Sequence, residues 1–159
     1  MTNHSRRGFL RNVTVAAPAA GVLGAGVAVS GEPIRHERRV VAGAPEAPFS
    51  RATIFGPFVF VAGVLGSKPG TREIPSGTFE AECVQALENL KASIESAGAR
   101  TTEVMKCTCF LTDVGDFATF NKVFRAYFPS KPPARSTVVV KELVAPAARI
   151  EIDCVAVLQ

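Results

Sequence analysis

Apolar residues recur every three or four positions between Thr78 and Gly98, and this spacing predicts an amphipathic helix. The apolar positions are Phe79, Cys83, Leu87, Leu90, Ile94 and Ala97. Glutamates and a lysine stand between them, so one face is expected to be buried and the other to lie in water. Gly98 is placed to end the helix as its C-terminal cap.

A second helix is expected after Asp113, because aspartate is a favourable N-cap residue. Its expected apolar face consists of Phe117, Phe120, Phe124 and Tyr127. Pro129 cannot continue a helix and is expected to stop it.

Runs of β-branched and aromatic residues predict strands on both sides of these helices. The expected strands are 51–55, 58–62, 104–112, 135–141 and 149–158. Gly56-Pro57 separates the first two as a hairpin turn, and the Gly-, Pro- and Ser-rich stretch 66–77 is expected to be a loop. The order of the elements predicts an α+β sandwich, with the helices on one face of a mixed sheet.

Residues 47–159 are expected to form this single domain. The polar, charged stretch 31–46 predicts a linker or a loosely attached first strand. Residues 1–30 combine the pair Arg6-Arg7 with an uncharged run rich in Val, Ala and Gly, as in a twin-arginine export signal. Such a signal predicts a periplasmic or secreted protein without stable membrane association after cleavage. A disordered basic tail and a retained membrane anchor are the alternatives.

The net charge does not predict a nucleic-acid partner. The formal charge is +4, but the first 30 residues contain three arginines and no acids, which leaves 15 minus 14, or +1, for the rest. A body so close to neutral lacks the basic surface that binds phosphate backbones.

Cysteine and histidine restrict the possible chemistry. Cys83, Cys107, Cys109 and Cys154 lack the spacing of a disulfide scaffold, and they are expected to fill the core as small hydrophobic residues. A metal site around Cys107 and Cys109 would need two further ligands nearby. The histidines are His4 and His36, so the domain contains no Ser-His-Asp triad, no Cys-His pair and no histidine zinc site.

The last expected strand carries an unusual pair of faces. Alternation places Ile150, Ile152, Cys154 and Ala156 on one face and Glu151, Asp153, Val155 and Val157 on the other. Carboxylates beside valines suit neither a solvent-exposed face nor a dry core. We therefore expect a subunit interface with a site at its edge.

Arg135 opens the preceding strand after the extended segment Pro132-Pro133 and shares a face with Thr137. A guanidinium offers a planar fork of donors that can hold a carboxylate through two parallel hydrogen bonds. The alternative is that Arg135 forms a structural ion pair with Glu151.

Several motifs resemble the RidA (YjgF) family of enamine/imine deaminases over roughly Ala44 to Leu158. They are Pro133-Ala134-Arg135-Ser136, Ile150-Glu151-Ile152, Val61-Ala62-Gly63, and Asp116-Phe117-Ala118 with Asn121. The resemblance implies a chorismate-mutase-like fold and a homotrimer with clefts between neighbouring subunits. It implies no metal or organic cofactor.

The resemblance also implies roles for individual residues. Arg135 would grip the carboxylate of a 2-imino acid, and Glu151 would orient or activate the water that attacks the imine carbon. The products would be a 2-keto acid and ammonia. Asn121 would belong to the same cleft.

Three positions depart from the archetypal family pattern, and all three belong to the expected substrate-binding set. Phe49 replaces a tyrosine and Ala62 replaces a serine, so two hydroxyls are missing. Thr137 stands where some members have a cysteine. A larger or more apolar substrate would suit Phe49 and Ala62 better than the archetypal one.

Other functions stay open at this stage. The same cleft could hydrolyse or isomerise another carboxylated metabolite. The protein could also be a non-catalytic trimer that binds a small carboxylate or acts like a chaperone. Ribonuclease activity has the least support, because the body is near neutral and the domain has no histidine.

Overall fold

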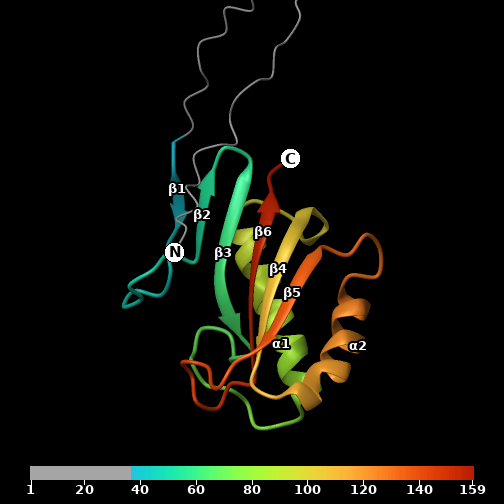
Figure 1. The fold of residues 1–159 in the computed structure, drawn as a ribbon. Helices are drawn as coiled ribbons and strands as arrows, with labels where there is room; N and C mark the ends of the chain where they lie inside the picture. The colour runs from blue at the N-terminus through green and yellow to red at the C-terminus, as the bar shows by residue number, and fades with distance from the viewer. Residues whose placement is uncertain (1–36) are drawn as a thin grey trace, which may run out of the picture. The chain divides into compact units, whose positions relative to one another are not determined.

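The computed structural model describes residues 37–159, which form one six-stranded mixed sheet with two α-helices (Figure 1). The predicted export signal, His36 and the first part of the predicted linker lie outside the described residues. The strands are β1 Arg39–Val41, β2 Ala52–Phe55, β3 Phe58–Leu65, β4 Val104–Leu111, β5 Ala134–Val139 and β6 Ile150–Val157. Their order across the sheet is β1-β2-β3-β6-β4-β5, so β5 is an edge strand.

The pairing of the strands confirms the predicted mixed sheet. β4 and β5 run parallel, and all other neighbouring strands are antiparallel. β1 falls within the stretch 31–46, which was expected to be a linker or a loosely attached strand. It pairs with β2 through Val40 and Thr53, so the sheet begins before Ala47.

Both helices, α1 Phe79–Ser96 and α2 Phe117–Tyr127, cover the same face of the sheet, as predicted (Figure 1). The Thr78 hydroxyl caps α1 by accepting a hydrogen bond from the Ala81 amide at 3.2 Å. Gly98 follows the helix with φ of 85°, a left-handed conformation that glycine adopts without strain.

The start of α2 differs from the prediction. Asp113 caps a short 3-10 turn, η2 Val114–Asp116, by accepting a hydrogen bond from the Gly115 amide at 2.7 Å. The α-helix starts only after this turn, because the Asp113 side chain satisfies an amide of the turn instead. Phe117 is 42% exposed, so it does not belong to the buried face. That face contains Phe120, Val123 and Phe124. A second 3-10 turn, η1 Thr101–Glu103, precedes β4.

The faces of β6 alternate as predicted. Ile150, Ile152, Cys154 and Ala156 are buried beneath the helices, whereas Glu151, Asp153, Val155 and Val157 are half-buried on the other side, which we call the open face. All four cysteines are free and buried, which confirms their role as core residues. Burial raises the pKa of Cys107 and Cys109 to about 12, so both thiols are protonated and unreactive near neutral pH.

Candidate active site

Arg135 lies at the edge of the sheet, with its side chain on the helix-covered face. Its strand partner on β4 is the buried Cys107, and residues paired in this way point to the same side of a sheet. The guanidinium carbon is 4.7 Å from the ring centre of Phe120 and 4.6 Å from that of Phe124. The guanidinium also donates a hydrogen bond to the Asn121 side-chain oxygen. α2 therefore holds the cation between aromatic rings and an amide.

Thr137 lies two residues further along β5 on the same face as Arg135, opposite the buried Cys109. Its hydroxyl oxygen is buried and has no hydrogen-bond partner within residues 37–159. A buried hydroxyl without a partner costs free energy, on the order of 1–3 kcal/mol, unless a ligand or water satisfies it. The helix-covered face thus brings three predicted site residues together: Arg135, Asn121 and Thr137.

Glu151 lies on the open face of β6, paired with Leu65 on β3 and Phe110 on β4. Its pKa is raised above the ordinary value of 4.5, chiefly because burial removes water from the carboxylate. The negative charge of Asp153 on the same face raises the pKa further. A carboxylate with a raised pKa is a stronger base, which suits proton abstraction from water.

Gly63 makes room for the Glu151 carboxylate. The pairing of β3 with β6 is irregular between Val61 and Val64, and Gly63 lies within this bulge. A Cβ atom on Gly63 would lie only 1.9 Å from Oε1 of Glu151. The motif Val61-Ala62-Gly63 by itself did not predict this contact. The signal was a lone glycine inside a strand, which indicates a bulge or a close approach.

Replacing Gly63 with alanine should therefore displace Glu151 while leaving the fold intact. For the imine hydrolysis that the family resemblance implies, with Glu151 as the expected base, kcat should fall about 10- to 100-fold, because a displacement of roughly 1 Å has that effect on a catalytic group. Gly77→Ala is the matched control, since a Cβ there meets nothing within 4 Å. Steady-state kinetics and circular dichroism of both variants check this. Wild-type kcat in a folded Gly63→Ala protein would contradict it.

Arg135 and Glu151 do not form an ion pair with each other within the described chain. They point to opposite faces of the sheet, because Arg135 pairs with core-facing Cys107 and Glu151 with Phe110 on the open face. The alternative of a structural ion pair within one protomer is therefore wrong.

Phe49 and Ala62 differ in their surroundings. Phe49 is 60% exposed in the turn before β2. Ala62 is half-buried beside Gly63 in the β3 bulge, near the Glu151 side of the site. The structure thus separates the predicted residues. The Arg135 group, which consists of Arg135, Asn121 and Thr137, lies on the helix-covered face, and Glu151 lies on the open face.

Residues 37–159 contain no cluster of three or more histidine, cysteine or acidic side chains suited to hold a metal ion. None of the helices in that part of the chain has the length and apolar character needed to cross a membrane.

The fold and site define a class of small α+β proteins that carry a fixed arginine at an edge strand and a glutamate on the open sheet face. A profile of the family described as Endoribonuclease L-PSP matches residues 40–158. The chain belongs to this family, which includes the RidA and YjgF proteins.

Named relatives share most of their length with the chain. The human 2-iminobutanoate/2-iminopropanoate deaminase is 37% identical over 124 residues, which cover 76% of this chain and 90% of the relative. The crystal structure of the Escherichia coli YjgF gene product has a TM-score of 0.68 at 34% identity, covering 74% of this chain and 94% of that one. Escherichia coli TdcF with bound serine has a TM-score of 0.66 at 34% identity, covering 71% and 90%. These structures confirm the predicted chorismate-mutase-like fold.

Proposed function

We propose that the protein hydrolyses a small 2-imino acid, or its enamine form, to a 2-keto acid and ammonia. The observation that carries the proposal is the Arg135 group: a cation held by Asn121 and two phenyl rings. Two residues along the strand lies the buried Thr137 hydroxyl, which has no hydrogen-bond partner among residues 37–159. A fixed guanidinium fork suits a carboxylate, and a nearby hydroxyl can donate one more hydrogen bond to it. The names of relatives, such as the human imine deaminase, support this reaction type.

The proposed reaction needs only positioning and one base. Arg135 binds the substrate carboxylate and so orients the imine carbon. Glu151 accepts a proton as a water molecule attacks that carbon, and a tetrahedral amino alcohol forms. Glu151 then gives this proton to the nitrogen and accepts the hydroxyl proton as the carbon–nitrogen bond breaks and the carbonyl forms. That last proton passes to the released ammonia, which leaves as ammonium, and Glu151 is ionised again. A protonated imine is already electrophilic, so orientation and one carboxylate base suffice.

Phe49 and Ala62 point to a substrate with a larger or more apolar side chain than the archetypal one. Both positions lack the hydroxyl that archetypal family members carry, and each missing donor weakens the recognition of a polar group by about 1 kcal/mol. The exposed Phe49 ring offers apolar contact area instead. The choice between small and larger imino acids is thus proposed to depend on these two side chains.

We also propose that the active unit is a homotrimer in which each cleft takes Arg135 from one protomer and Glu151 from its neighbour. One protomer directs these two groups to opposite faces, so a second copy is needed to bring them together. The open face suits self-association, because Phe58 and Phe60 on β3 and Val138 on β5 are 46–48% exposed there. Phe58 and Phe60 pair with Val157 and Val155 of β6, and Val138 pairs with Phe110, the β4 neighbour of Glu151. Exposed aromatic and branched residues grouped in this way are typical of protein interfaces.

Mixing two inactive variants tests this arrangement. Arg135→Ala and Glu151→Gln should each be inactive alone, but co-refolded mixtures should regain activity, because some clefts then combine an intact Arg135 with an intact Glu151. When equal amounts mix at random, about a quarter of all clefts contain both an intact Arg135 and an intact Glu151, so about a quarter of the wild-type activity should return. No recovery in a mixture shown by native mass spectrometry to contain mixed oligomers would contradict a shared cleft.

The reaction itself is tested with imino acids generated in place by an amino-acid oxidase. We expect residues 31–159 to accelerate ammonia release, with leucine- or phenylalanine-derived imines preferred over the alanine-derived one. Thermal stabilisation by 2-keto acids without turnover would replace the proposal with a non-catalytic carboxylate-binding function. We do not propose ribonuclease activity, because the sequence beyond residue 30 has a net charge of +1 and its only histidine is His36. Export through a twin-arginine signal, and thus a periplasmic or secreted location, stays a proposal.

A further inference from the structure

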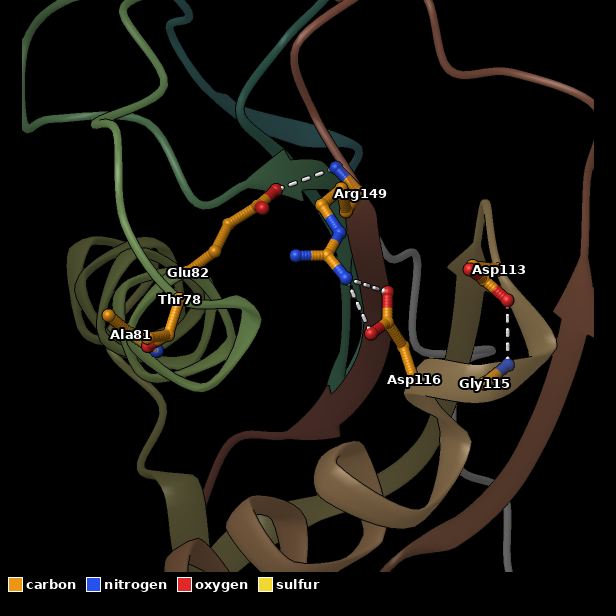
Figure 2. A network of polar contacts seen from close by, with 7 residues as sticks. All are labelled: Thr78, Ala81, Glu82, Asp113, Gly115, Asp116 and Arg149. Carbon is orange, nitrogen blue, oxygen red and sulfur yellow. Dashed lines mark hydrogen bonds and ion pairs between the residues drawn. The ribbon is translucent and has the colours of Figure 1, made fainter.

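Arg149 directly precedes β6 and contacts side chains from two other parts of the chain (Figure 2). One terminal nitrogen of its guanidinium donates to both carboxylate oxygens of Asp116 at 2.6 Å. Its backbone amide donates to a side-chain oxygen of Glu82 at 2.7 Å, and its carbonyl accepts from the Thr112 amide at 3.1 Å. The guanidinium also lies 4.8 Å from the ring centre of Phe79.

These contacts tie the start of β6 to both helices. Glu82 and Phe79 belong to the first turn of α1, and Asp116 directly precedes α2. Glu82 is only 5% exposed, and a buried carboxylate needs such partners because burial removes its water. Close packing of Glu82 also requires Gly66, since a Cβ there would lie 2.5 Å from Cγ of Glu82.

Glu151 follows Arg149 by two residues, so whatever fixes Arg149 also fixes the strand that carries the carboxylate. Glu151 itself pairs with Leu65 of β3 and Phe110 of β4, and Gly63 leaves the space that its carboxylate occupies. Glu82 also holds the β3 side, because Gly66 follows Leu65 directly and packs against Glu82. The same contact network thus holds the start of β6 and the end of β3 beside the Glu151 carboxylate.

We propose that Arg149 is a positioning residue of this site: by binding Asp116 and Glu82 it holds the start of β6, and with it Glu151, in place for water attack. The inference rests on the proposed function, in which Glu151 handles the water. The contacts of Arg149 are with Asp116, Glu82 and Phe79, so it acts on Glu151 through the position of the strand.

Arg149→Met tests the proposal, because it keeps an unbranched apolar stem similar to that of arginine and removes the guanidinium that contacts Asp116. We expect kcat to fall about 10- to 100-fold, as for a misplaced catalytic group, with KM little changed. KM depends on Arg135, and α2 still packs into the core through the buried Phe120, Val123 and Phe124 without this ion pair. Arg149→Lys should restore most of kcat, because a single nitrogen makes both contacts with Asp116.

Arg100→Met is the matched control. Arg100 contacts Gln159, which follows the far end of β6, and lies 3.6 Å from Glu103. The same substitution therefore removes a contact with the chain beyond the end of β6 that is remote from Glu151, and kcat should stay at the wild-type value. Equal losses in both variants, or no rescue by lysine, would overturn the positioning role and leave Arg149 as a general stabiliser.

A second readout separates this inference from the proposed reaction. If the wild type hydrolyses no imine, the proposed function fails, and the carbon-13 NMR titration of the Glu151 carboxyl then decides the inference. Arg149→Met should lower the pKa of Glu151 towards its ordinary value, because a carboxylate released from its buried place regains water. An unchanged titration in a folded Arg149→Met protein would overturn the proposal, as would an unchanged kcat if the wild type is active.

Discussion

Replacing Arg135 with alanine is expected to lower kcat/KM for a 2-imino acid by roughly 100- to 1000-fold, or about 3 to 4 kcal/mol. The substitution removes the cation that holds the substrate carboxylate. It also leaves the Asn121 oxygen without its donor and two phenyl rings without the guanidinium. Steady-state kinetics of ammonia release, with thermal unfolding to confirm the fold, would measure the effect.

Two further variants sharpen the Arg135 experiment. Arg135→Lys keeps the charge but loses the planar fork, so we expect an intermediate loss, dominated by KM. Arg72→Ala removes an exposed arginine from the loop before α1 and should leave kcat/KM unchanged. If Arg135→Ala kept wild-type activity, the carboxylate clamp would be wrong and the substrate would bind elsewhere.

Replacing Glu151 with glutamine is expected to lower kcat by roughly 100- to 10,000-fold, the usual range for the loss of a general base, with KM nearly unchanged. Glutamine has almost the same shape, so it fits beside Gly63, but it cannot accept the proton of the attacking water. A higher KM with an unchanged kcat would contradict the role of a base.

The pH dependence gives a further test of Glu151. Only the ionised carboxylate accepts a proton, so activity should rise with pH as Glu151 ionises. Burial and the Asp153 charge raise the pKa of Glu151. The midpoint of the increase in activity should therefore lie at a pH above 4.5, the ordinary pKa of glutamate. Asp153→Asn removes one of these causes and should move the rise to lower pH. Glu151→Gln should abolish it.

Local sequence patterns were sufficient for most of the fold. The period of the apolar residues in α1, the alternation in β6 and the position of Gly98 each depend on neighbours along the chain, so they could be predicted. The start of α2 could not be predicted in this way. Asp113 could cap either an α-helix or a 3-10 turn, and in the structure its side chain accepts a hydrogen bond from an amide of the 3-10 turn. β1 could not be predicted with certainty for a different reason: a three-residue, mostly exposed strand is stable only because β2 lies beside it.

The sequence alone predicted which residues are candidates for the chemistry. It singled out Arg135, Glu151 and Asn121, and it assigned Arg135 and Glu151 to separate strands. Only the tertiary structure decided how these residues are arranged. The order of β5, β4 and β6 in the sheet places Arg135 beneath α2 and Glu151 on the opposite face. Contacts such as Gly63 with Glu151, and Arg149 with Asp116, join segments far apart in the chain. No local pattern encodes those contacts, because they arise only when the strands pair and the helices pack.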